Sequence, residues 1–243
     1  MSLNLGKSWR LLATPSFWVA LGIAWLLFSL YLLLALQEYL AVAPMLAGLD
    51  NQPGATALLL GQGMRALQWL MVVWTVFFVA RLFAGERQWM AFHLRRTSLS
   101  RRDRGWLSHL CVAWLVLLLL SVPFWLLVAL LALAVDWDVH LLVAYALLQL
   151  GFAAYAAMLA AMLALWPGQI ITAALLVAMV WLVLWLLPVL TSQPPWLVAL
   201  LQWFSPFSHN TLLLDGLWSA QTALFFLLHA AFFLTWIAMG WKR

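Results

Sequence analysis

Long apolar runs constrain the fold of this chain more than any other feature. Hydrophobic residues make up 67% of its 243 residues and charged residues only 8%. Soluble globular domains carry about 25% charged residues. A helix needs about 20 apolar residues to cross about 30 Å of hydrocarbon. The sequence therefore predicts an all-α integral membrane protein with several spans.

We expect six transmembrane helices in a single domain, which covers residues 1–243. Pro123 predicts a kink in the third of these helices. Residues 1–15 are amphipathic and predict an interfacial helix before the first span. The expected spans are residues 17–36, 66–83, 105–131, 141–165, 170–190 and 220–239.

Two connecting segments and one small-residue pattern refine this expectation. Residues 37–62, with a charge at Glu38, predict a mixed loop, and the interrupted aromatic segment 191–219 predicts re-entrant or interfacial structure before the last span. The fourth span carries alanines at four-residue spacing, which predict a helix face packed closely against neighbours. These alanines are Ala153, Ala157 and Ala161 in one row and Ala156, Ala160 and Ala164 in the other.

A basic stretch at residues 81–104, the basic loop, sets the expected topology. It holds seven of the twelve Lys and Arg residues. By the positive-inside rule, the loop and both termini face the cytoplasm, which places 11 of the 12 positive charges inside. The exception is Arg65, near the outer end of the second expected span. Its side chain either snorkels to the interface or belongs to a substrate path.

Several classes of function are not expected from these residues. The chain has no phosphate-binding loop and no metalloprotease or hydrolase motif, so we expect no catalysis, metal or cofactor within it. Its basic residues are distributed as topology signals, which argues against nucleic acid as a partner. No acidic residue lies at the centre of an expected span, as ion-coupled transport would favour. His109 and His229 leave a small membrane haem protein as one alternative.

Five short motifs occur in an order that is typical of one family. They are RLFAGER at 81–87, TSLSR at 97–101, TPS at 14–16, QIITA at 169–173 and SPFSH at 205–209. In this order they resemble the type-2 ATP-binding-cassette (ABC) transporter permeases, above all the GldF-like branch. The chain departs from that pattern at residues 88–92 and at Ser98, where the family commonly has Gly-Thr with Leu-rich sequence and Pro.

The resemblance implies a half-transporter in the bacterial inner (plasma) membrane. Its expected partners are a separate ABC ATPase subunit that holds ATP and Mg, a second permease subunit in a homo- or heterodimer, membrane lipids and an accessory GldG-like protein. Residues 87–95 would form a coupling helix seated in the ATPase. The implied partner-binding residues are Glu86, Arg87, Trp89, Met90, Phe92, Arg95 and Arg96.

The expected cargo and the remaining alternative follow from the same residues. A cavity between two such subunits would be apolar and aromatic, which favours export of amphiphilic or lipid-like cargo. The arginines of the basic loop also fit a non-transporting membrane anchor, a scaffold that recruits cytosolic partners.

Overall fold

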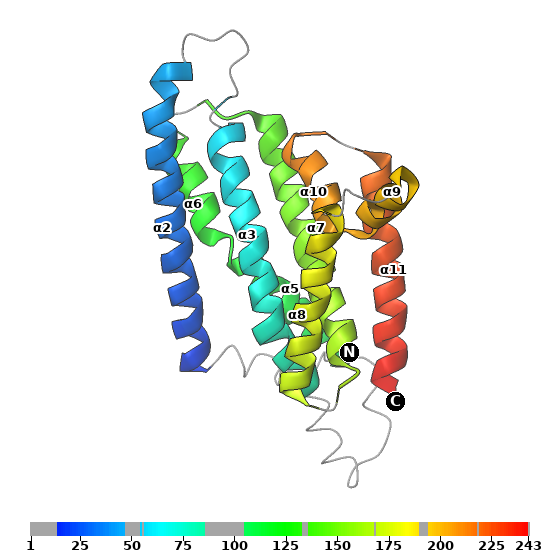
Figure 1. Cartoon of the computed structure of the whole chain (residues 1–243). Helices are drawn as coiled ribbons and strands as arrows, with labels where there is room; N and C mark the ends of the chain where they lie inside the picture. The colour runs from blue at the N-terminus through cyan, green and yellow to red at the C-terminus, as the bar shows by residue number, and fades with distance from the viewer. Residues whose placement is uncertain are drawn as a thin grey trace.

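The computed structural model describes residues 14–46, 54, 56–85, 105–132, 136–167, 169–189, 194–217 and 219–242. Within these residues the regular structure is entirely helical, and six helices are long and apolar enough to cross a membrane (Figure 1). The expected fold class is therefore confirmed, and the chain is a multi-span membrane protein. The coupling helix expected at residues 87–95 lies outside the described residues, as does the interfacial helix of residues 1–15 except for its last two residues.

The first two spans are longer than their apolar runs. Helix α2 covers Pro15–Leu46. The second span, Thr56–Gly85, is built from η1 (Thr56–Leu60), α3 (Gly61–Trp74), η2 (Thr75–Val79) and a final turn. The expectation that residues 37–62 form a loop is wrong at both ends. Counting apolar residues marks only the hydrocarbon layer, whereas intrahelical hydrogen bonds carry a helix past Glu38 and through Gln62.

The third span is broken as Pro123 predicts. Helices α5 (Gly105–Leu119) and α6 (Val122–Leu131) flank a turn at Ser121. The Ser121 hydroxyl donates to the Leu118 carbonyl at 2.7 Å. Pro123 lies in the first turn of α6, where its missing N–H removes no helical bond.

Helix α7 (Val139–Ala164) is the centre of the bundle. It begins at Asp138, whose carboxylate accepts hydrogen bonds from the backbone N–H groups of His140 and Leu141 at 2.9 and 3.3 Å. In its most apolar window 61% of the residues are buried, against 17% in the fifth and sixth spans. All six alanines of the two rows are fully buried, so the predicted close packing is confirmed.

Between the fifth span, which ends at Val189, and the sixth, which begins at Ala220, the described residues form two short helices. Helix α8 (Ile170–Leu186) continues as η4 (Leu187–Val189), and α9 (Pro195–Phe204) and α10 (Pro206–Leu214) precede α11 (Ala220–Lys242). Figure 1 shows α9 and α10 beside the upper ends of α8 and α11. Ten residues of helix span only about 15 Å. The expected break in the regular spans is therefore present as two short helices.

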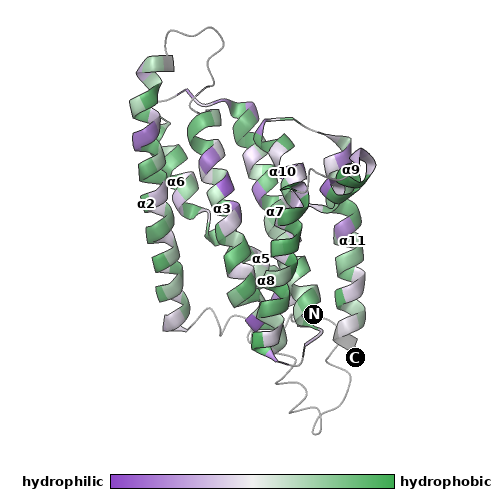
Figure 2. Ribbon diagram, in the orientation of Figure 1, coloured by the Kyte–Doolittle hydropathy of each residue, from purple (hydrophilic) through white to green (hydrophobic). Residues whose placement is uncertain are grey.

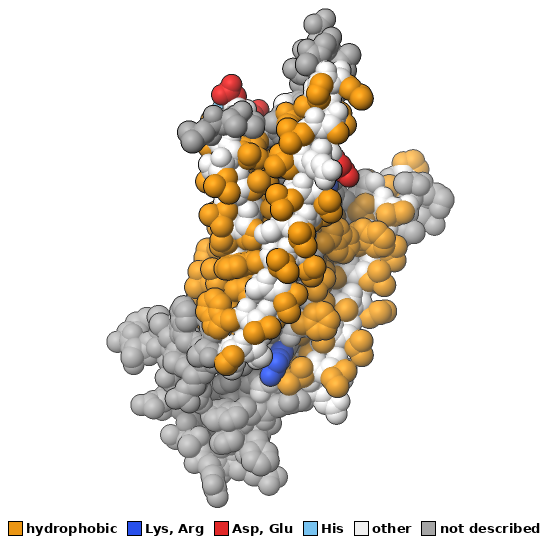
Figure 3. Space-filling model, turned by 90° about the vertical axis from the view of Figure 1, so that its left-hand side faces the viewer, with side chains coloured by type: hydrophobic (Ala, Val, Ile, Leu, Met, Phe, Trp, Pro, Cys, Tyr) orange, Lys and Arg blue, Asp and Glu red, His pale blue; other side chains and the backbone are white. Residues whose placement is uncertain are grey.

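The outer surface of the bundle is apolar between its two ends. Figure 3 shows hydrophobic side chains over the face formed by α2, with acidic groups near the upper end and a basic patch near the lower end. Asp138 and Asp215 cap α7 and α10 at the upper end, and Arg81 lies in the last turn of the second span. This polarity agrees with the expected placement of the basic loop in the cytoplasm.

Candidate functional site

The predicted partner-binding residues lie outside the described part of the chain. These residues are Glu86, Arg87, Trp89, Met90, Phe92, Arg95 and Arg96, and their role stays a prediction. The structure does describe the two ends from which the basic loop leaves the bundle. These ends are residues 81–85 and the start of α5 at Gly105.

The two ends of the basic loop are joined to each other and to α8. Phe83 is fully buried, and its ring lies 6.0 Å from the ring of His109 in α5. A Cβ atom on Gly85 would lie 3.8 Å from Cδ1 of Ile170, the first residue of α8. A displacement of the basic loop would therefore act on the second, third and fifth spans together.

A buried hydrogen bond joins the second and fifth spans nearer the middle of the bundle. The indole N–H of Trp181 donates to the Thr75 hydroxyl at 3.0 Å, and that hydroxyl donates to the Val72 carbonyl at 2.6 Å. Thr75 opens the π-helix η2, and π-helical turns occur often at functional sites. Because both side chains are buried, α8 and the second span form one mechanical unit.

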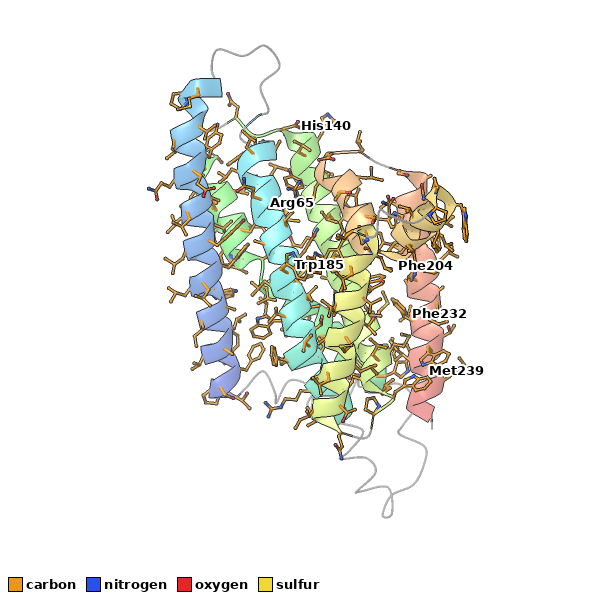
Figure 4. The ribbon with its side chains drawn as sticks, viewed as in Figure 1. Arg65, His140, Trp185, Phe204, Phe232 and Met239 are labelled. Atoms are coloured by element: carbon orange, nitrogen blue, oxygen red, sulfur yellow. The ribbon has the colours of Figure 1, made fainter. Side chains whose placement is uncertain are left out.

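Arg65 lies in the upper part of the helix that forms the second span (Figure 4). It is nine residues beyond Thr56, or about 14 Å along the helix axis. Its side chain is exposed, and a row of exposed residues at spacings of three and four continues along the same helix face. We call this row the α3 stripe. It consists of Gln62, Arg65, Trp69, Val73 and Phe77.

An aromatic group lies one helical turn below Arg65. Trp69 stacks on Phe207 of α10, with ring centroids 5.2 Å apart and planes at 22°. Trp69 also meets Trp185 of α8 edge to face at 5.8 Å. Figure 4 labels Arg65 on α3 and Trp185 on α8. A cation and aromatic rings from three helices thus share one side of the molecule.

Buried polar groups gather behind the α3 stripe. Gln68 is 5% exposed and Asn210 of α10 is 1% exposed. The Gln68 Nε2 atom and both amide atoms of Asn210 have no hydrogen-bond partner within the described residues. Each unsatisfied buried group costs about 1–3 kcal/mol. Figure 2 shows hydrophilic turns in the upper half of α3, whereas α8 is mostly hydrophobic.

The electrostatic surroundings of Tyr145 place Arg65 close to α7. The Tyr145 hydroxyl donates to the Leu214 carbonyl at 3.3 Å. Arg65, Asp138 and Asp215 all lie near enough to act on this phenol through their charges. The polar groups of α3, α7 and α10 therefore form one cluster in the upper half of the bundle.

The SPFSH motif packs the α9–α10 pair against the spans around it. The Ser205 hydroxyl donates to the Leu184 carbonyl of α8 at 2.8 Å. Phe207 contacts Trp69, and also Phe152 of α7 at 6.0 Å. His209 stacks on Phe225 of α11 at 4.2 Å. The motif thus contacts four helices, namely α3, α7, α8 and α11.

Sequence reasoning missed a cavity between α7, α8, α9 and α11. Its volume is about 440 Å³. Its lining is apolar and aromatic, so no charged or metal-binding pattern marks it in the sequence. The lining residues are Tyr155, Leu159, Val180, Leu184, Trp203, Phe204, Leu228, His229, Phe232 and Phe233.

The two histidines considered for haem have different surroundings. His109 is buried beside Phe83, at the inner end of the third span. His229 lies in the cavity wall, and its Nδ1 atom bonds to the Phe225 carbonyl at 2.9 Å. Among the described residues, no cluster of three or more His, Cys, Asp or Glu side chains could hold a metal ion.

Comparison with known proteins adds no family to this description. No protein-family model matches the chain, and no curated protein matches it.

Proposed function

We propose that this chain is the permease subunit of a transporter that is driven by a separate ATPase docked on the basic loop. The family of this proposal is the type-2 ABC permeases, which the order of five motifs resembles. One observation of the structure carries the proposal. The loop leaves the bundle at the point where Phe83 packs on His109 and Gly85 lies against Ile170. A force on the loop would reach three spans at once.

The tie between Trp181 and Thr75 supports the same mechanism. Movement that enters at Gly85 and Ile170 would pass along α8 and the second span as a pair. These two elements also carry Trp185, Trp69 and Arg65. A movement driven by the proposed ATPase would thus shift the helices that form the surface around the α3 stripe.

The α3 stripe supports a second permease subunit. A charged residue that faces lipid is costly, with an upper value of about 2.5–3.5 kcal/mol at the centre of a membrane helix by insertion scales. Arg65 is exposed on a single chain, and no ion pair with Arg65 occurs among the residues that the structure describes. A second subunit over this face would shield Arg65 from lipid. It would also enclose a path in which Arg65 binds the polar end of an amphiphile and Trp69 its apolar part.

The proposal predicts a loss of coupling when the first charges of the basic loop are removed. The test uses the chain reconstituted in liposomes with the ATPase that co-purifies with it. A Glu86→Ala, Arg87→Ala double variant should lower the permease-dependent ATPase rate about tenfold or more, because truncating a docked charge pair costs about 2–5 kcal/mol. Insertion and thermal stability of the permease should not change.

A matched control separates docking from charge count. Lys242→Ala removes a positive charge next to the C-terminus, which is expected on the same cytoplasmic side as the basic loop. This variant should leave the ATPase rate unchanged. If the ATPase works at the same rate with and without this chain, the proposal fails and the membrane-anchor alternative is favoured. An absorbance spectrum of the purified chain tests the haem alternative, because a Soret band would support it.

A further inference from the structure

We propose that the cavity between α7, α8, α9 and α11 binds an uncharged, membrane-dissolved amphiphile, an apolar molecule that carries a single hydroxyl group. The site belongs to one chain and needs neither a second permease subunit nor an ATPase. It goes beyond the proposed function and does not depend on it.

The cavity is an open groove on the side of the bundle, and its size is that of a small-molecule site. Its volume of about 440 Å³ lies within the roughly 300–1,000 Å³ that is usual for ligand pockets. Phe204, Leu228 and Phe232 line it and are themselves exposed on the outside of the bundle. Figure 4 shows Phe204 and Phe232 on the side of α9 and α11. A molecule dissolved in the surrounding membrane could therefore reach the cavity.

An unpaired hydroxyl in the wall indicates that the occupant is more than hydrocarbon. Tyr155 is 2% exposed, and its hydroxyl makes no hydrogen bond within the described residues. The hydroxyl oxygen is not one of the fully buried polar atoms without a partner, so it faces open space rather than packed protein. The ring itself is held firmly, since it contacts Phe225 at 5.7 Å and Phe233 at 5.3 Å. The hydroxyl is thus held in place and available to a ligand.

His229 adds a hydrogen-bond acceptor to the same wall. Its Nδ1 atom lies 2.9 Å from the Phe225 carbonyl oxygen, which can only accept, so Nδ1 carries the proton. In this neutral tautomer Nε2 is a free acceptor. The rings of His229 and Tyr155 are 5.8 Å apart. One donor and one acceptor in the same wall match an alcohol, which both accepts and donates.

The remaining lining excludes a charged ligand. The other lining residues are aliphatic or aromatic, and none is Lys, Arg, Asp or Glu. An ion held there without a counter-charge would lose its hydration with nothing to replace it. A pure hydrocarbon would leave the Tyr155 hydroxyl without a partner. A neutral alcohol satisfies both conditions.

Photolabelling of the reconstituted chain tests this inference. The probes are a long-chain alcohol that carries a diazirine and the matching alkane without the hydroxyl, both in phosphatidylcholine liposomes. We expect the alcohol to label peptides of α8, α9 and α11 that line the cavity. Tyr155→Phe should lower alcohol labelling about fivefold, the effect of one neutral hydrogen bond of about 1 kcal/mol. Alkane labelling should stay as it is.

Two further variants keep the test independent of folding. Leu228→Trp fills the cavity and should lower labelling by both probes. Leu26→Trp, on the exposed face of α2, is the matched control and should change neither. Thermal unfolding of each variant confirms that it is folded. Equal alcohol labelling of the wild type and Tyr155→Phe would overturn the inference, as would labelling of α2 as strong as that of α11, which indicates only surrounding lipid.

Discussion

The α3 stripe and the cavity between α7, α8, α9 and α11 are lined by different helices. They differ mainly in charge. Both are rich in aromatic rings and both are open on a single chain. The α3 stripe carries the cation of Arg65, which is costly to expose to lipid hydrocarbon. The cavity carries no charged side chain, and its polar groups are the Tyr155 hydroxyl, the His229 imidazole and the Trp203 indole N–H. The comparison suggests that the first surface needs a protein partner, whereas the second can be completed by a membrane molecule.

Helix α7 separates the two regions, and α10 connects them. The ring of Phe152 in α7 contacts the rings of Phe207 and Trp181. Tyr155, one turn further along α7, lines the cavity. In α10, Phe207 contacts Trp69 of the α3 stripe, and His209 stacks on Phe225, which packs on Tyr155 in the cavity wall. A change in either helix should therefore be felt in both regions.

The largest effect is expected from overpacking α7. Ala157 is fully buried between neighbouring helices. Ala157→Leu would force those helices apart and should cost about 1–3 kcal/mol of stability. A thermal unfolding midpoint measured in detergent should fall accordingly. Because α7 is the shared wall, alcohol labelling of the cavity and ATPase coupling should both decline.

The matched control is the same substitution on the surface of α2. Ala20 is exposed, so Ala20→Leu should change the unfolding midpoint little. Equal midpoints for the two variants would contradict the placement of α7 at the centre of the bundle.

The packing of α7 was also the feature that could best be predicted from the sequence. Alanines spaced four apart lie on one helix face, and in lipid such a face is useful only against another helix. The six spans and the Pro123 kink followed in the same way from apolar runs and from backbone chemistry. The ends of the helices could not be predicted in this way, because a count of apolar residues leaves out the turns of α2 beyond Glu38.

The two candidate sites were only partly accessible to such reasoning. Arg65 was found by its charge, but its depth depended on where the second span begins, and that start contains polar residues such as Gln62. The cavity had no signal, because Tyr155 and His229 are ordinary residues until four helices bring them together. The predicted docking residues of the basic loop lie outside the described residues and remain predictions.

A second, smaller effect is expected from removing the charge that distinguishes the α3 stripe. Arg65→Leu should lower cargo-stimulated ATPase activity about tenfold, which corresponds to about 1.4 kcal/mol of lost interaction with the cargo. The midpoint of thermal unfolding should be unchanged or higher, because an exposed cation is removed from the span. Alcohol labelling of the cavity should not change, since His229 and Tyr155 are untouched.

Arg65→Lys is the control that keeps the charge. It should retain most of the activity, although a lysine cannot bind two oxygens as a guanidinium does. If Arg65→Leu leaves the ATPase activity at the wild-type level, Arg65 serves only as a snorkelling residue, and the contrast between the two regions loses its functional meaning.

The smallest effect is expected from His209 of α10, whose ring stacks on Phe225 next to the cavity wall. Burial lowers the pKa of His209, a backbone hydrogen bond to Trp203 raises it, and the neighbouring His229 lowers it. The folded chain therefore binds this proton less well than the unfolded chain, whose histidine pKa is about 6.5. Stability present above about pH 6.5 should be lost as the pH falls towards the lower pKa of folded His209. Unfolding midpoints measured across this range should fall less steeply in His209→Gln than in the wild type. Identical slopes in the two proteins would contradict the lowered pKa of His209 in the folded chain.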